Sequence, residues 1–210
     1  VVEMSLGDTK STTIVLADAG RASLSAQVAA LLRQGERVIA VDPFYFGESS
    51  LGSKDFLYGL LLASVGDRPL GIETAQVVAV VDWLRKESQT PIRLESFGPR
   101  TSLIALCAAV VSKKIDSMVL HDSLTSLKDV LTQNKGVDEA PDLFTFGLLE
   151  FADIPQLVAA AGRCVRSRRR ADGVGGRPTA PVVLRGLVRQ WPLPRARCAH
   201  DPRAARGRRA

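Results

Sequence analysis

A short turn at residues 98–102, with the sequence GPRTS, constrains the fold of this chain more than any other segment. An apolar strand pattern precedes it at 92–97, and an apolar helix pattern follows it from about 101 to 112. Gly98 and Ser102 are small and stand two places either side of Arg100, as a sharp turn requires when it brings a strand and a helix close together. The segment therefore predicts a strand, a strained turn and a buried helix in direct succession.

This layout is typical of a nucleophile elbow, whose central residue is Ser, Asp or Cys. The central residue of this chain is Arg100. An arginine side chain does not lose its proton in a protein, so it cannot attack a carbonyl group. The turn therefore predicts the architecture of a hydrolase without its usual nucleophile.

Strand and helix patterns alternate over the first 160 residues, which predicts right-handed crossovers between parallel strands. The near-continuous apolar run at 37–42 is typical of a parallel strand that is covered on both faces. Strands are predicted at 12–17, 37–42, 92–97 and 115–121, and helices at 22–34, 54–64, 71–87, 101–112, 124–133, 141–150 and from Asp153 as N-cap. The fold class is α/β, with a mostly parallel sheet and helices on both faces. The chemistry of such a sheet lies at the carboxyl ends of its strands, in the loops that start at Asp18, Pro43, Gly98 and Asp122.

Three segments carry a resemblance to a known family. Residues 41–49, VDPFYFGES, resemble a strand and loop that often read D-x-x-G-x-G-x-S, and residues 79–84, AVVDWL, resemble the helix before the elbow strand. Residues 98–102 fall where the family carries G-x-S-x-G. In this order they resemble the α/β-hydrolase fold, in the branch of acetylxylan esterases and dienelactone-hydrolase-like proteins. The resemblance covers about residues 12–160 and implies a partial α/β-hydrolase domain at 1–160 that lacks the last strands of the fold.

The resemblance also implies a set of site residues. The nucleophile position of the family falls on Arg100, and the first glycine of its elbow motif falls on Gly98, two residues earlier. The backbone N–H of Thr101 falls on one donor of the oxyanion hole, and the loop with Ala19 and Gly20 falls on the other. The family's acid and histidine follow later strands and have no matching position here. The implied function is a degenerate, non-catalytic domain related to acetylxylan-type carboxylic ester hydrolases.

Four other residues are candidates for chemistry near the turn. Ser96 nearly forms an S-x-G motif but falls inside the predicted strand, and Ser102 falls in a first helical turn, where serine commonly satisfies a backbone N–H. Asp122 stands where some hydrolases place the acid of the triad. His121 is its neighbour, but adjacent residues on a strand point to opposite faces, which favours a structural role for the histidine.

Two further polar positions have alternative interpretations. Arg100 either ties a loop or presents a cation that binds a carboxylate or phosphate. Asp42, at the end of a strand, is expected to bond its own loop. Cys107 lies in the apolar helix pattern and is expected to belong to the core rather than to act as a thiol.

The last fifty residues differ in composition from the rest. Residues 161–210 contain 14 Arg and no Lys, whereas residues 1–160 contain 7 of each. Segments with this density of like charge and so little apolar content are typically disordered. Such a tail is either a basic arm that binds nucleic acid or an anionic surface, or the product of a G/C-rich gene read out of frame. The second interpretation predicts that Cys164, Cys198 and His200 carry no chemistry.

Composition narrows the remaining expectations. No segment approaches the roughly 20 apolar residues of a membrane span, and the chain opens on Val1 without a signal-peptide pattern, which suggests a fragment. No cofactor, metal, nucleic acid or membrane is expected, and the compartment is left open, since the family is often secreted or periplasmic. The expected partner is an upstream esterase domain of the same full-length protein. The alternatives are an active carboxylic ester hydrolase with a non-standard nucleophile, and a binder that acts through the basic tail.

Overall fold

The computed structural model describes residues 1–162 and 165–168. They form a six-stranded sheet in the order β1-β3-β2-β4-β5-β6. The strands are β1 (Val2–Met4), β2 (Thr12–Ala17), β3 (Arg37–Ala40), β4 (Ile92–Phe97), β5 (Ser117–His121) and β6 (Val165–Arg168). β1 runs antiparallel to β3, and every other pair is parallel. The predicted α/β class with a mostly parallel sheet is confirmed.

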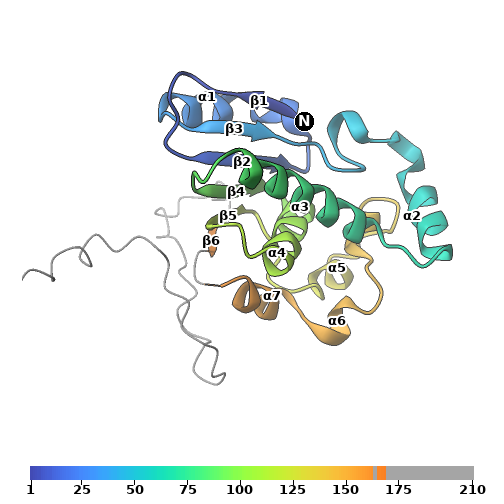
Figure 1. The fold of residues 1–210 in the computed structure, drawn as a ribbon. Coiled ribbons are helices and arrows are strands. Elements are labelled where there is room, and N and C mark those ends of the chain that lie inside the picture. Colours follow the sequence, from blue (N-terminus) through green and yellow to red (C-terminus); the bar gives the residue numbers. More distant parts are fainter. Residues whose placement is uncertain (163–164, 169–210) are drawn as a thin grey trace, which may run out of the picture.

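Helices cover both faces of the sheet (Figure 1). They are α1 (Ser25–Arg33), α2 (Asp55–Ser64), α3 (Pro69–Glu87), α4 (Pro99–Val111), α5 (Asp129–Thr132), α6 (Leu148–Phe151) and α7 (Ile154–Ala161). Short 3₁₀ turns lie at Arg21–Leu24, Gly47–Ser49, Gly52–Lys54 and Pro141–Leu143. The predicted N-cap Asp153 is confirmed: its carboxylate accepts the backbone N–H of Ile154 at the start of α7.

Alternation along β2 divides the core into two layers. Ile14 and Leu16 pack in the larger layer, which includes the buried side chains of α3, α4 and α7. Val15 and Ala17 point to the other face, where Leu24, Val28 and Leu31 of the first helical segment cover them. Because both faces of β2 are covered, every residue of the strand is buried and the strand has no polar side.

The strand order has a topological switch point between β2 and β4. β2 comes first among the parallel strands, and the chain then adds β3 on one side and β4, β5 and β6 on the other. Connections leave β2 and β4 in opposite directions, so the loops after their carboxyl ends separate, and ligands of open α/β sheets bind at such a point. Asp18 follows β2 and Gly98 follows β4.

Some predicted elements differ from the structure. The strands at 12–17 and 92–97 are confirmed residue for residue, whereas β1 and β6 have no counterpart among the predicted strands. β6 extends the sheet beyond residue 160, where the sequence predicted a tail, and the rest of that tail, residues 169–210, lies outside the described residues. Cys164, Cys198 and His200 also lie outside them.

Two predicted helices are much shorter than expected. Only Asp129–Thr132 of 124–133 is helical, because the Asp129 carboxylate accepts the backbone N–H groups of Thr125 and Ser126 and holds that stretch as a turn. The predicted helix at 141–150 is interrupted by Gly147, whose φ is 90°. A left-handed residue ends the hydrogen-bond ladder of a right-handed helix.

Within the described residues, no individual helix has the length and apolar character to cross a membrane, although the bent pair Pro141–Phe151 and Ile154–Ala161 passes that test by length and composition together.

Candidate functional site

The turn after β4 has the strained geometry that its sequence predicts. Gly98 has a φ of 116°, a value that L side chains rarely adopt, and α4 begins directly after it. A Cβ at this position would also overlap the carboxyl group of Asp18. Glycine at 98 is therefore required twice, by the backbone conformation and by the close approach of the loop after β2.

The Asp18 carboxylate occupies the N-terminal end of α4. It accepts the backbone N–H of Arg100 at 3.1 Å and that of Thr101 at 2.8 Å, and also the Thr101 hydroxyl at 2.7 Å. Burial raises the pKa of Asp18, and the hydrogen bonds from Thr101 and Arg100 oppose that rise. The Thr101 N–H, which the resemblance assigns to an oxyanion hole, is thus bonded to a side chain of the same chain.

The loop assigned to the second donor is also bonded internally. The backbone N–H of Gly20 donates to the carbonyl of Ala17 at 2.9 Å, while Ala19 is exposed. Asp42 accepts the backbone N–H and the guanidinium of Arg21 at 2.7 and 3.0 Å, and so ties the loop after β3 to the loop after β2. This is the loop-bonding role predicted for Asp42.

The Arg100 side chain is largely buried and forms its contacts within the protein. Its Nε and Nη2 donate to Oδ1 of Asp142 at 2.8 and 2.5 Å, and its guanidinium lies 4.4 Å from the ring centroid of Phe46. Burial alone would lower the pKa of Arg100, but hydrogen bonding and the negative charge of Asp142 outweigh it, so that the pKa is raised. Arg100 therefore remains a cation and binds a carboxylate of its own chain.

A second buried carboxyl group, that of Glu73, interacts with the charges of Asp142, Arg100 and Asp18, and we refer to these four residues as the cluster. Glu73 of α3 is fully buried, and neither of its oxygens has a hydrogen-bond partner within the described part of the chain. Burial, with the charge of Asp142 adding to it and that of Arg100 opposing it, raises the pKa of Glu73 to about 9. Burial and the charge of Glu73 also raise the pKa of Tyr45 to about 12. Glu73 is therefore neutral at pH 7, and the cluster pairs one arginine with one aspartate.

The two candidate serines are buried and bonded to each other. The hydroxyls of Ser96 and Ser102 lie 3.1 Å apart, and that of Ser102 is 3.4 Å from the carbonyl oxygen of His121. Ser96 shares its sheet face with the buried layer under α3 and α4, since it is in register with Leu120. Neither hydroxyl faces an open edge of the sheet.

The histidine lies on the opposite face of the sheet. His121 is in register with Phe97 and stacks on its ring with the centroids 4.3 Å apart, and its Nε2 lies 2.7 Å from Oε1 of Glu95. Its Nε2 partner is Glu95, whose side chain lies on the face of the sheet opposite to Ser96. Asp122 follows β5 with an exposed side chain and a φ of 57°. The imidazole of His121 is therefore not brought together with the hydroxyls of the two candidate serines, Ser96 and Ser102.

Cys107 packs against the core, and the described residues contain no group of side chains suited to a metal ion. Cys107 is partly buried against the larger core layer, and burial together with the charge of Glu73 raises its pKa to about 11. A thiol with such a pKa is protonated at neutral pH and is a poor nucleophile. Across residues 1–162 and 165–168, no three His, Cys, Asp or Glu side chains are grouped so that they could hold a metal ion.

Three residues of the cluster are absent from the set predicted from sequence: Asp18 as an acceptor, Glu73 and Asp142. A signal for Glu73 exists in its spacing, because it falls on the stripe of Leu70, Val77, Val81 and Leu84 that α3 buries. A carboxyl group on an apolar stripe indicates a buried partner or an altered pKa. Asp142 gives no comparable signal, since it lies in a short 3₁₀ turn.

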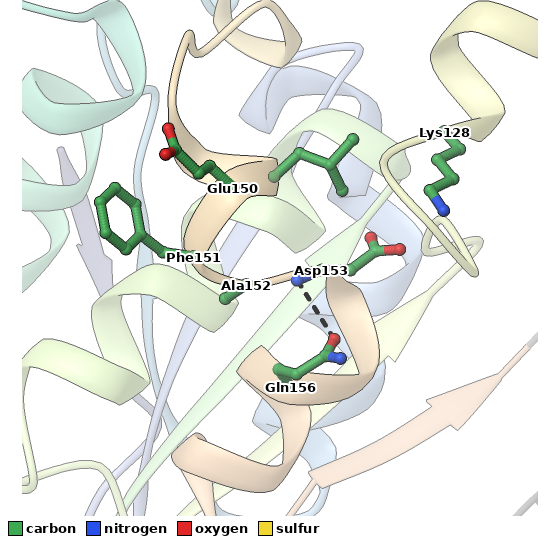
Figure 2. A pocket seen from close by; sticks show the side chains of 7 residues that line it. Lys128, Glu150, Phe151, Ala152, Asp153 and Gln156 are labelled. Carbon is green, nitrogen blue, oxygen red and sulfur yellow. Dashed lines mark hydrogen bonds between the residues drawn. The ribbon is translucent and has the colours of Figure 1, made fainter.

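A hollow of about 270 Å³ lies away from the elbow, between α5, α6 and α7. Lys128, Glu150, Phe151 and Gln156 line it, as Figure 2 shows, together with Leu149, Ala152 and Asp153. The Asp153 carboxylate is fully engaged there, since it accepts the Ser126 hydroxyl and two backbone N–H groups. The hollow therefore contains no group arranged to act as a nucleophile.

No family model and no curated protein matches the sequence. Among solved structures, the fold is similar to a novel cold-adapted esterase from an Arctic intertidal metagenomic library, at 16% identity. The alignment with its PEG-bound form covers 78% of this chain and 74% of the esterase chain, with a TM-score of 0.45. The alignment with its zinc-bound form covers 79% of this chain and 73% of the esterase chain, with a TM-score of 0.44. The structure described as AbyA5 wildtype is 13% identical and covers 79% of this chain and 55% of its own, with a TM-score of 0.46. These similarities are distant, and the α/β assignment rests on the strand order of the chain itself.

Proposed function

We propose that this chain is a non-catalytic, hydrolase-like domain related to carboxylic ester hydrolases of the acetylxylan esterase type. One observation carries the proposal: the chain's own carboxylates occupy the elbow. Asp18 accepts the backbone N–H groups at the start of α4, and Asp142 binds the side chain that stands in the nucleophile position. An oxyanion needs donors that are open to the substrate, and acyl transfer needs a group that can attack.

The electrostatics of the cluster support the same proposal. The pKa of Arg100 is raised by Asp142, so the side chain does not become a base near neutral pH. Glu73 is buried without a hydrogen-bond partner among the described residues and lies on the inner side of α3. A general base must reach the proton that it removes, through a hydrogen bond or one water molecule. The arrangement therefore holds a loop against the sheet and does not move protons at a surface.

Hydrolysis of p-nitrophenyl acetate tests the proposal. The purified chain is expected to show no rate above a heat-inactivated sample of the same preparation, because the elbow lacks a nucleophile and open donors. A fluorophosphonate probe that labels active serines is expected to leave the chain unmodified. A rate that the probe abolishes, and that is lost in Ser96→Ala or Ser102→Ala, would instead establish an ester hydrolase with a non-standard nucleophile.

The proposed role is that of an accessory domain beside an active esterase domain of the same polypeptide. A domain that keeps the hydrolase architecture but fills its own elbow is suited to packing and binding rather than turnover. The gene sequence around the coding region tests this role, since it requires an intact G-x-S-x-G domain in the same reading frame. An open reading frame without such a domain would contradict it.

A further inference from the structure

Helix α2 is apolar but lies on the outside of the molecule (Figure 1). Its inner side is identified by Gly59, where an added Cβ would contact Pro141 and Pro69. The large apolar side chains that remain exposed on α2 and at its C-cap form what we term the α2 stripe: Leu57, Tyr58, Leu60, Leu61 and Val65, each between 47% and 74% exposed. At the borders of the stripe, Tyr58 also contacts the ring of Phe44, and Leu60 lines a small hollow beside Gly59. Not one residue of α2 is buried.

The α2 stripe is unusual for a surface helix because it contains no charged side chain. The first charged residues that flank it are Lys54 and Asp55 before it, and Asp67 and Arg68 after it. A helix that is apolar all round normally lies in a core, and contiguous exposed apolar surface marks an interaction site. The α2 stripe is therefore expected to be covered by a partner.

The charges at its two ends indicate which partner. Helices that lie on an anionic lipid surface carry Lys and Arg along the polar face, whereas the inner face of α2 packs against its own chain. Lys54 and Asp67 are both exposed, have opposite signs and are equally far in sequence from the midpoint between Leu60 and Leu61. Lys54 directly precedes α2, and Asp67 lies in the loop that follows it. An antiparallel pair of α2 helices, related by a twofold axis at that midpoint, would bring each Lys54 beside the partner's Asp67.

We propose that two copies of this chain associate through the α2 stripe, helix against antiparallel helix. The contact is isologous: apolar side chains meet the same set from the second copy, and the Lys54 and Asp67 pairs fix the register at both ends. The five side chains would bury on the order of 500 Å² per copy, below the ~800 Å² of a standard interface. The dimer is therefore expected to be reversible and to form in the micromolar concentration range.

Sedimentation velocity of the full chain across micromolar concentrations measures this association. The parent chain is expected to shift from monomer to dimer, and Leu61→Lys is expected to weaken the dimer by about tenfold or more, because it places two charges at the twofold axis. Leu131→Lys is the matched control, since Leu131 is 72% exposed on α5 and lies outside the stripe. It is expected to dimerise like the parent chain.

A charge-exchange experiment tests the antiparallel register. Lys54→Asp gives two copies with acids at both ends of the stripe, and Asp67→Lys gives two copies with bases at both ends, so each variant alone is expected to dimerise several-fold more weakly. An equal mixture of the two variants is expected to recover the affinity of the parent chain, since both end pairs are again complementary. Circular dichroism melts verify that each variant is folded.

Three results would overturn the proposal. The parent chain stays monomeric at every concentration, Leu131→Lys dissociates the dimer as strongly as Leu61→Lys, or the mixed variants fail to recover affinity. Co-sedimentation with phosphatidylcholine and phosphatidylglycerol vesicles adds a fourth: binding that Leu61→Lys abolishes would assign the stripe to a lipid surface. Esterase activity has no bearing on these outcomes, so the dimer and the inactive elbow stand or fall separately.

Discussion

Helices α4 and α2 have similarly apolar sequences but opposite surroundings. α4 lies between the sheet and its neighbours α3 and α7, and eight of its side chains are buried. α2 buries none of its side chains. The polar groups at the start of α4 are matched by Asp18 and Asp142, whereas α2 presents Leu60 and Leu61 to solvent. Apolar composition alone thus does not distinguish a core helix from a surface helix; the difference is that α4 packs on the sheet.

The largest expected difference concerns the ion pair of α4. Arg100→Met is expected to lower the free energy of unfolding by about 3–5 kcal/mol, because it leaves the fully buried Asp142 charged and without its partner. Chemical denaturation in urea measures the loss. The double variant Arg100→Met with Asp142→Leu is expected to recover most of it. A loss below about 1 kcal/mol in the single variant would show that the pair does not hold the loop.

The next effect compares two acids that lie at the start of the two helices. Asp18→Ala is expected to lower the free energy of unfolding by about 2–3 kcal/mol, since three donors of Arg100 and Thr101 lose their acceptor. Asp55→Ala at the start of α2 removes the acceptor of the Leu51 N–H in an exposed turn, and is expected to lower the free energy of unfolding by about 0.5–1 kcal/mol. Equal losses would contradict the contrast between the two carboxyl groups.

The raised pKa of Glu73 predicts that the free energy of unfolding depends on pH. Its folded pKa is raised above the unfolded value of 4.5, to about 9, so the folded chain holds a proton that the unfolded chain releases. Stability therefore falls as pH rises from about 4.5 to about 9, by at most about 1.4 kcal/mol per pH unit. Glu73→Gln removes this loss and is expected to be more stable than the parent chain at pH 8, by at most about 5 kcal/mol.

Thermal melts at pH 5 and pH 8 check this prediction. The advantage of Glu73→Gln should shrink at pH 5, because that pH is close to the unfolded pKa of 4.5, and taking up the proton on folding then costs little. Glu139→Gln is the control, because Glu139 is exposed and its substitution should change neither melt. A parent chain with the same stability at both pH values would show that Glu73 ionises without penalty.

The smallest expected effect is on α2 itself. Leu61→Ala is expected to change the unfolding free energy of the monomer by less than about 0.5 kcal/mol, because Leu61 is 61% exposed. Leu106→Ala, at a fully buried position of α4, is the matched comparison and is expected to be destabilising by about 2–5 kcal/mol. Dilute samples, in which the chain is monomeric, separate folding from association. A large loss for Leu61→Ala under those conditions would place α2 within the fold.

The central strands and the turn between β4 and α4 were predictable because their signals are local. An apolar run predicts β2, the apolar positions of the short strand pattern at 92–97 predict β4, and Gly98 predicts a positive φ. β1 and β6 gave no such signal: three and four residues pair at the edges of the sheet, and the sequence of β6, VRSR, has no apolar run. Edge strands are specified by their neighbours more than by their own side chains.

The occupation of the elbow was not predictable from local patterns. Asp18 and Thr101 are 83 residues apart, and their contact exists only because β2 and β4 are neighbours in the sheet. The pairing of Arg100 with Asp142 likewise depends on how the chain returns after β5. Sequence reasoning could identify an arginine where a nucleophile belongs, but its partner follows from topology.

The carboxylate of Asp18 has a consequence for how the turn after β4 can change by mutation. A serine at position 100 would stand beside N–H groups that Asp18 already holds, and it would leave Asp142 buried without a cation. Removing Asp18 first leaves those N–H groups without an acceptor, and removing Asp142 first leaves Arg100 without its anion. Each of these single substitutions is therefore expected to give a less stable protein. Selection for folding alone would keep the four residues Asp18, Arg100, Thr101 and Asp142 together.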